Sequence, residues 1–172
     1  VISGKNRALI PGLINTHTHI PMTLMRGYAD DYDLNTWLYQ YIFPAEDKLD
    51  DRCVRAGCEI GMAEMIASGT TSFSDSYYFC EQIAQTALQS GMKANIGRAV
   101  SNFEKEITLH DFYATREAVE LCEKWHNADD GRIRIDAAIH AEYTSSVSLW
   151  RELSAFAHEH ALIMQLHLAE TQ

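Results

Sequence analysis

The 172-residue sequence has few basic side chains, with 14 Lys and Arg against 24 Asp and Glu, and its formal charge is −10. A negative field of this size repels phosphate backbones and anionic lipid surfaces, so we expect neither nucleic acid nor membrane as a partner. No uninterrupted apolar run approaches the roughly 20 residues that cross a bilayer. The sequence starts at Val1 without a secretory signal, so we expect it to begin inside a protein.

Cysteine is scarce and lacks a metal-binding spacing. The four residues, Cys53, Cys58, Cys80 and Cys122, form no CxxC pair and lie in stretches that otherwise read as helix or core. A thiolate metal site needs clustered ligands, whereas free cysteine packs as a small hydrophobe. We therefore expect reduced, buried thiols and a cytoplasmic protein.

Short apolar runs alternate with helical patterns along the chain. We expect strands at 13–16, 70–73, 93–100, 133–139 and 162–168, and helices at 34–42, 50–67, 83–88, 112–125 and 149–160. The segment from His17 to Asp33 contains Pro21 and Gly27 and has no regular period, which predicts a long loop. Strands and helices that alternate at this spacing favour a parallel sheet with right-handed crossovers.

Two parallel-sheet folds fit this order, the closed barrel and the open doubly wound sheet. No GxGxxG follows the first strand, although the phosphate loop of a dinucleotide-binding fold requires one. Polar residues instead recur where successive strands end, which is typical of the (β/α)8 TIM-type barrel. A complete barrel needs about 250 residues. We therefore predict an α/β chain that holds about the first five strands of such a barrel.

Three histidines and one glutamate are the candidate reactive residues. His17 and His19 follow the first strand, and residues two apart on an extended chain share a face, so both can reach one metal ion. His167 ends the fifth apolar strand, where an unpaired imidazolium would be costly. Together the three imidazoles would form a zinc site with room for water. Glu170 follows just outside the strand and could transfer protons.

Each of these residues also has an ordinary structural interpretation. An isolated HxH pair is more often two solvated histidines than a metal site. His167 could be a hydrogen-bonded core histidine, and Glu170 an exposed loop carboxylate.

Four segments of the chain resemble the amidohydrolase superfamily. They are residues 11–27 (PGLINTHTHIPMTLMRG), 33–38 (DLNTWL), 64–75 (EMIASGTTSFSD) and 165–171 (QLHLAET). The likeness is to the branch of metal-dependent deaminases and chlorohydrolases, which includes methylthioadenosine/S-adenosylhomocysteine deaminase. The resemblance implies a (β/α)8 barrel beside a small β-sandwich built from both chain ends. Residues 1–9 would end the N-terminal sandwich part, and residues 10–172 would form a barrel truncated after its fifth strand.

The resemblance also implies roles for individual residues. His17, His19 and His167 would ligate one divalent metal ion, Zn²⁺ in the first place, with Fe²⁺ and Ni²⁺ as alternatives. Glu170 would protonate a ring nitrogen of the substrate. A single metal is expected because the fourth strand ends at His140, where two-metal members of the superfamily carry a carboxylated lysine.

Three further residues resemble substrate contacts of these deaminases. Trp37 would line the base pocket, Arg98 would contact the distal part of the substrate, and His140 would contact the substrate from the fourth strand. The plain alternatives are a core anchor, a surface cation and a solvated ring, respectively. Asn35 replaces a glutamate that accepts from both ribose hydroxyls in adenosine-type deaminases, and the stretch 101–110 lacks a second arginine. These departures weaken the expectation of a nucleoside.

We therefore predict a metal-dependent hydrolytic deaminase that releases ammonia from an N-heterocyclic small molecule, such as an aminopurine, an aminopyrimidine or a nucleoside-like compound. We expect it to act as a homo-oligomer. A triazine-type chlorohydrolase on the same scaffold is the second possibility. The third is a catalytically inert segment, because the family's sixth-strand histidine and eighth-strand aspartate would lie beyond Gln172.

Overall fold

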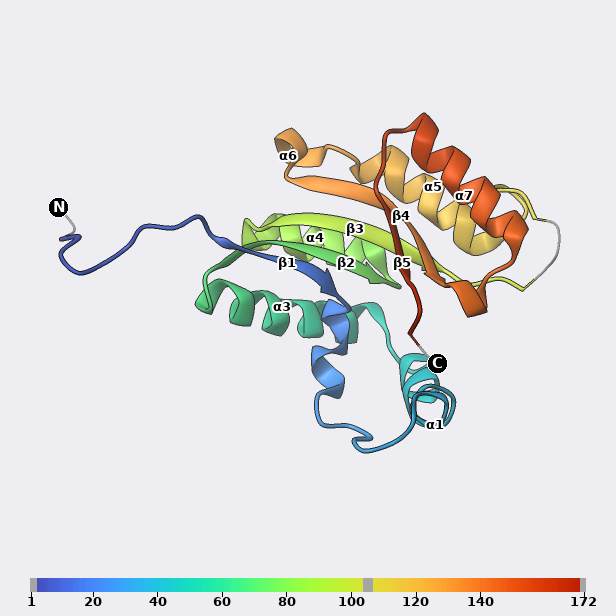
Figure 1. Ribbon diagram of the computed structural model, residues 1–172, viewed down its shortest axis with the longest axis horizontal. Coiled ribbons are helices and arrows are strands. Elements are labelled where there is room, and N and C mark those ends of the chain that lie inside the picture. Colours follow the sequence, from blue (N-terminus) through green and yellow to red (C-terminus); the bar gives the residue numbers. More distant parts are fainter. Residues whose placement is uncertain (1–2, 104–106, 171–172) are drawn as a thin grey trace.

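The computed structural model describes residues 3–103 and 107–170. Five parallel strands form one curled sheet in the order β1-β2-β3-β4-β5 (Figure 1). The strands are β1 Leu13–Thr18, β2 Thr70–Tyr77, β3 Lys93–Val100, β4 Ile133–Ala141 and β5 Met164–His167. Each strand pairs with the next one in sequence, which is how a (β/α)8 barrel begins. The predicted partial barrel is confirmed.

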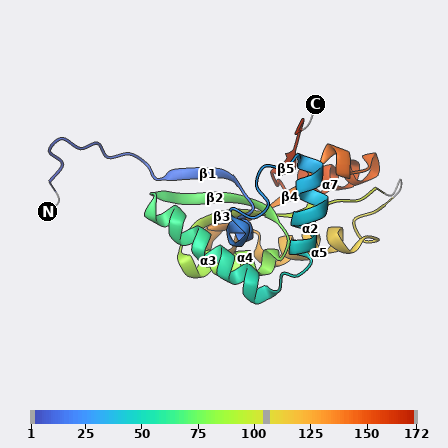
Figure 2. The same ribbon diagram turned by 90° about the horizontal axis from the view of Figure 1, so that it is seen from below.

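Helices connect the strands and cover one face of the sheet. They are η1 Ile20–Met25, α1 Leu34–Thr36, η2 Trp37–Ile42, α2 Phe43–Glu46, α3 Asp51–Ala67, α4 Cys80–Ser90, α5 Tyr113–Trp125, α6 Ala128–Gly131, η3 Glu142–Thr144 and α7 Val147–Glu159. Helices α3 and α4 lie beneath β1, β2 and β3 in Figure 2, while α5 packs on β3 and α7 on β4. Within the described residues, no helix is long and apolar enough to cross a membrane.

The hydrophobic core fills the space between the sheet and these helices. Ile96 of β3 and Ile133, Ile135 and Ile139 of β4 are all buried, as expected for strands covered by helices. Removing this apolar surface from water is the main force that holds the helices on the sheet. The four cysteines are free, with Cys53 half-buried and the other three buried, so the expectation of buried thiols is confirmed for three of the four.

The opposite face of the sheet carries a polar layer. Asn95 of β3 and Gln165 of β5 donate to the two carboxylate oxygens of Asp136 on β4, at 2.9 and 2.6 Å. Strand alternation places these side chains on the face away from the helices. This face would line the interior of a closed barrel.

Standard capping residues set the ends of the long helices. The carboxylate of Asp50 accepts from the Cys53 N–H at 2.7 Å and begins α3, and the Ser146 hydroxyl accepts from the Leu149 N–H at 3.2 Å and begins α7. Gly91 ends α4 with a left-handed φ of 77°, which glycine adopts without strain.

Several predicted boundaries were wrong. Strand β1 continues through His17 to Thr18, and β2 continues past Phe73 to Tyr77. The segment 17–33, predicted as a loop, contains the helix η1. The helix predicted at 34–42 continues to Glu46 across Pro44, which has no N–H to donate. The wider π-helical turn η2 precedes this proline, where a regular helical hydrogen bond would be lost.

Residues 3–12 run as an irregular segment away from the sheet, and Leu9 is fully exposed (Figure 1). Residues 1–2, 104–106 and 171–172 lie outside the described part of the chain. They include the start of the predicted sandwich piece 1–9, the middle of the stretch 101–110, and Thr171 of the fifth-strand motif.

Candidate metal centre

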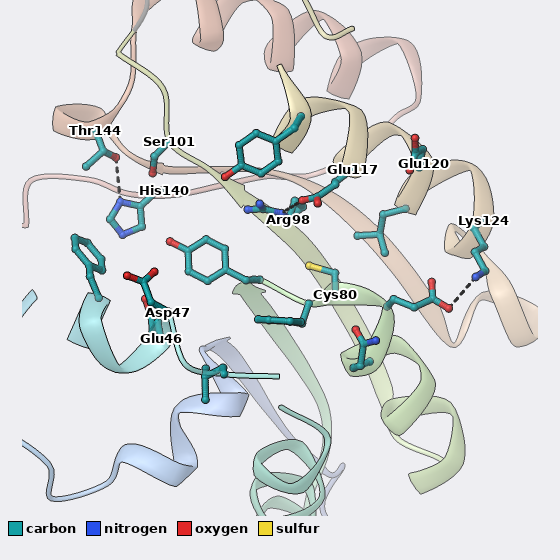
Figure 3. Close-up of a pocket in the computed structure, with 18 of the residues that line it drawn as sticks. Glu46, Asp47, Cys80, Arg98, Ser101, Glu117, Glu120, Lys124, His140 and Thr144 are labelled. Carbon is teal, nitrogen blue, oxygen red and sulfur yellow. Dashed lines mark hydrogen bonds and ion pairs between the residues drawn. The ribbon is translucent and has the colours of Figure 1, made fainter. Parts of the chain in front are cut away.

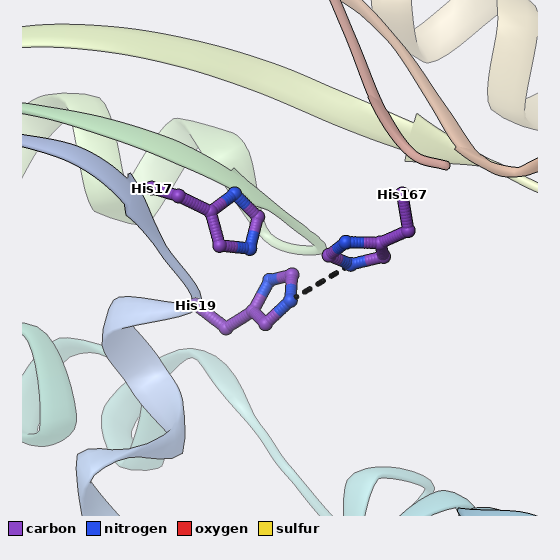
Figure 4. A group of neighbouring side chains, drawn as sticks. All are labelled: His17, His19 and His167. Atoms are coloured by element: carbon purple, nitrogen blue, oxygen red, sulfur yellow. Dashed lines mark hydrogen bonds between the residues drawn. The ribbon is translucent and has the colours of Figure 1, made fainter. Parts of the chain in front are cut away.

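Three histidines from the two outer strands of the sheet meet at its carboxyl edge. His17 lies in β1, His19 lies between β1 and η1, and His167 ends β5. One ring nitrogen of each lies within 4.8 Å of the others, and His19 Nε2 is 3.1 Å from His167 Nε2 (Figure 4). Residues separated by about 150 positions in the chain therefore converge on one point.

The ring of His19 is held by the neighbouring strand. Its Nδ1 lies 2.5 Å from the backbone carbonyl of Ser76 on β2. A carbonyl can only accept, so Nδ1 carries the proton and the lone pair of Nε2 faces the other two rings. A second hydrogen bond of this kind is how proteins commonly orient a histidine that ligates a metal.

Burial favours the neutral form of two of the three histidines. Burial is the largest cause that lowers the pKa of His19 to about 4, and it outweighs the Ser76 hydrogen bond, which raises it. Burial and then the proximity of His167 lower the pKa of His17. The neutral imidazole is the form that binds a metal ion, so both shifts favour metal binding.

A pocket of about 190 Å³ adjoins the histidines and contains most of the predicted substrate contacts. Its lining includes His19, His167, Trp37, His140 and Glu170. The His140 ring centroid is 5.4 Å from that of His167. The exposed Glu170 accepts a hydrogen bond from the Tyr143 hydroxyl at 2.8 Å, which holds its carboxylate at the edge of the site.

The predicted contact Arg98 lies elsewhere. Its buried guanidinium forms an ion pair with Glu117 at 2.7 Å and lies over the ring of Tyr78, with Cζ 5.0 Å from the centroid. It lines a larger pocket of about 960 Å³ (Figure 3). The two pockets share four lining residues, Phe43, Glu46, Tyr78 and His140.

The sequence analysis missed residues that shape this site. Glu46 of α2 is a partly buried carboxylate that accepts from the Tyr77 hydroxyl at 2.6 Å and borders both pockets, and burial raises its pKa. Asp75 of β2 is fully buried and accepts a hydrogen bond from the backbone N–H of Ile20, the residue after His19. Asp75 lies between the buried Phe73 and Tyr77 on one face of an alternating strand. This pattern could have predicted a buried carboxylate with hydrogen-bond partners, because a carboxylate buried without partners is costly.

Close packing fixes the helix η1 that follows the histidine pair. Gly57 and Gly61 of α3 face η1 one helical turn apart. A Cβ at Gly57 would lie 2.6 Å from the backbone oxygen of Pro21, and one at Gly61 would lie 2.7 Å from Cγ1 of Ile20. Only glycine lets the two helices approach this closely.

Comparison with known proteins extends over nearly the whole chain. Residues 8–172 match the Amidohydrolase family. A 5'-deoxyadenosine deaminase of Methanosphaera stadtmanae is 42% identical over 173 residues, which is 100% of this chain and 40% of that protein. A 5-methylthioadenosine/S-adenosylhomocysteine deaminase of Dictyoglomus turgidum is 41% identical over 174 residues, covering 99% of this chain and 39% of that protein.

A solved structure shows the same arrangement of elements. The crystal structure of an adenosine deaminase from Xanthomonas campestris with bound zinc superposes with a TM-score of 0.84 at 34% identity. The match covers 94% of this chain and 36% of that one. The chain therefore spans about 40% of the length of the relatives that it matches.

Proposed function

Since the chain belongs to the amidohydrolase family, we propose that it supplies the metal ligands and a proton-transfer group of a hydrolytic deaminase. The substrate would be an adenosine-like or related N-heterocyclic small molecule, and the product ammonia. The observation that carries this proposal is the convergence of His17, His19 and His167 beside a pocket that also holds Glu170.

The three histidines fit a zinc ion. Imidazole nitrogen is a preferred zinc ligand, and a catalytic site keeps positions open beyond its protein ligands. Burial lowers the pKa of His17 and His19, which favours their neutral form, and Ser76 fixes the tautomer of the His19 ring. When bound, the metal would lower the pKa of water and so supply a nucleophile near neutral pH. Fe²⁺ and Ni²⁺ remain alternatives.

The remaining pocket residues would handle the substrate. Glu170 would exchange a proton with a ring nitrogen, and the Tyr143 hydroxyl would keep its carboxylate oriented for this. Trp37 offers an aromatic face in the pocket, and His140 presents a ring whose Nδ1 is engaged by the Thr144 hydroxyl at 3.0 Å. Arg98 would contact a distal group of the substrate in the larger pocket.

The proposed active site would include residues from outside these 172. We propose that the chain is continued, in what we call the extended protein, through three further barrel strands that carry the family's sixth-strand histidine and eighth-strand aspartate. Its relatives are about two and a half times as long as the matched part. We expect the extended protein to be a cytoplasmic homo-oligomer.

Ammonia release tests the proposed function. The zinc-loaded extended protein should release ammonia from at least one of adenosine, 5'-deoxyadenosine, 5'-methylthioadenosine, guanine and cytosine. Chelation should abolish the release, and added Zn²⁺ should restore it, because the nucleophile depends on the metal. A chlorotriazine serves as the comparison substrate. Release of chloride without any ammonia would replace deamination by the chlorohydrolase alternative, and no product from any compound would contradict both.

A further inference from the structure

A buried carboxylate without a positive partner lies beneath the histidine pair. Asp75 is fully buried, and no basic side chain among the described residues pairs with it. Its Oδ2 lies 2.6 Å from the Ile20 backbone nitrogen and 2.7 Å from the Thr18 hydroxyl. Both contacts join β2 to residues more than 50 positions earlier in the chain.

These two contacts lie on either side of His19, in the segment 17–20 that carries the histidine pair. Thr18 lies between His17 and His19, and Ile20 directly follows His19. The Ile20 N–H belongs to the first turn of η1, where backbone donors lack a partner inside the helix. By accepting from this N–H, the carboxylate fixes the point at which the chain leaves the strand and turns into the helix.

The next residue of β2, Ser76, contacts the same segment. Ser76 holds the His19 ring through its carbonyl, while Asp75 holds the backbone on either side of that ring. The register places Thr18 opposite Asp75 after an irregularity in β1 between Asn15 and Thr18. A regular strand pairing therefore does not fix His17, and the side-chain contacts must supply the missing constraint.

The cost of this arrangement shows that it is not there for stability alone. Oδ1 of Asp75 is buried without a hydrogen-bond partner in the described structure. A buried unsatisfied polar atom costs about 1–3 kcal/mol, and an apolar residue at the same position would avoid that cost. The other oxygen, Oδ2, makes both of its hydrogen bonds to the segment that carries His17 and His19.

We propose that Asp75 is a positioning residue of the metal centre, acting through Thr18 and Ile20 to keep His17 and His19 directed at the same point as His167. This inference rests on the proposed function, because it assumes that the three histidines bind a metal ion. It adds a residue of β2 that would contact neither the metal nor the substrate.

Cobalt binding by the extended protein tests the proposal. Co²⁺ replaces Zn²⁺, its visible absorption spectrum reports the ligand geometry, and competition with a chromophoric chelator gives its affinity. Asp75→Ala should lower the Co²⁺ affinity by about 10- to 100-fold, the usual effect of losing a group that orients metal ligands. Asp75→Asn should recover most of that loss, because its amide oxygen can still accept from the Ile20 N–H.

Two further variants separate positioning from general destabilisation. Leu153→Ala removes a buried side chain of α7, an element that supplies none of the three histidines and none of the contacts of Asp75. It should lower the melting temperature and leave the Co²⁺ affinity within twofold of wild type. If Asp75→Ala does not fold, Thr18→Val takes its place, since it removes one of the two groups that contact the carboxylate. We expect Thr18→Val to lower the affinity by about threefold or more.

The outcomes are distinguishable. An Asp75→Ala protein that melts at a lower temperature but binds Co²⁺ within twofold of wild type, with an unchanged spectrum, would overturn the proposal. An Asp75→Asn protein that binds no better than Asp75→Ala would overturn it as well. A wild-type extended protein that binds no Co²⁺ would instead refute the metal site itself.

Discussion

The contact between α3 and η1 predicts a specific effect of adding one methyl group at Gly57. The new Cβ would lie 2.6 Å from the backbone oxygen of Pro21, well inside the 3.4 Å at which ordinary contact begins. A backbone atom cannot rotate away, so η1 has to shift. Because η1 begins next to His19, the shift should reach the metal ligands.

The size of the effect follows from two opposing contributions. Overpacking a close-packed contact costs about 1–3 kcal/mol. Alanine in place of glycine within a helix stabilises that helix by about 1 kcal/mol. Because the clash is with a backbone atom, the upper part of the overpacking range, about 2–3 kcal/mol, applies. We therefore expect Gly57→Ala to destabilise the extended protein by about 1–2 kcal/mol and to lower its melting temperature. The Co²⁺ affinity should fall with it.

Gly61→Ala is the matched control on the same helix face. Its Cβ would meet side-chain atoms, Cγ1 of Ile20 at 2.7 Å and Oγ1 of Thr23 at 2.9 Å, which can adjust. Its loss of melting temperature and of Co²⁺ affinity should be smaller than that of Gly57→Ala. A Gly57→Ala protein that melts at or above the wild-type temperature, with unchanged Co²⁺ affinity, would refute the reasoning.

Three further predictions follow from the same geometry. Burial raises the pKa of Asp75 from 3.8 to about 7, so between these pH values the folded state binds a proton that the unfolded chain does not. The free energy of unfolding should therefore fall as the pH rises from about 4 to about 7. The melting temperature of Asp75→Asn should depend less on pH than that of the wild type, and an equal dependence in both proteins would contradict the raised pKa of Asp75. Burial, and then the charge of Asp75, raise the pKa of the Cys58 and Cys80 thiols, which favours their neutral form. Arg98→Met should raise KM about tenfold for substrates with a polar distal group and leave it unchanged for the free base, and equal KM changes for both would remove Arg98 from the substrate site. The 172-residue chain alone should dimerise or aggregate because β1 and β5 are sheet edges, and a monodisperse monomer in light scattering would disprove this.

The parts of the site that the sequence predicted are those with a local signal. The HxH spacing at His17 and His19 and the histidine in an apolar strand at 167 could be read directly, and the structure brings the three together. The strand and helix order followed from the hydrophobic period. Each of these patterns predicts structure only within a few residues of its own position in the sequence.

The parts that the sequence analysis missed depend on contacts between distant segments. The extension of β1 to Thr18 is stabilised by β2, and the helix η1 depends on the glycines of α3 for its place. The ion pair between Arg98 and Glu117 joins β3 to α5, and no sequence pattern within β3 predicts it. Hydrophobic period cannot specify a partner, so these features appear only in three dimensions.

The most direct test of the central claim compares zinc content with turnover in two variants of the extended protein. The account predicts about one zinc per chain in the wild type, and a clear loss of metal in His167→Ala, because one of few ligands is missing. Glu170→Gln should keep its zinc and lose about 10²-fold or more of its rate of ammonia release, as expected for a proton-transfer group. Full zinc in His167→Ala, or full activity in Glu170→Gln, would contradict the assignment of this site.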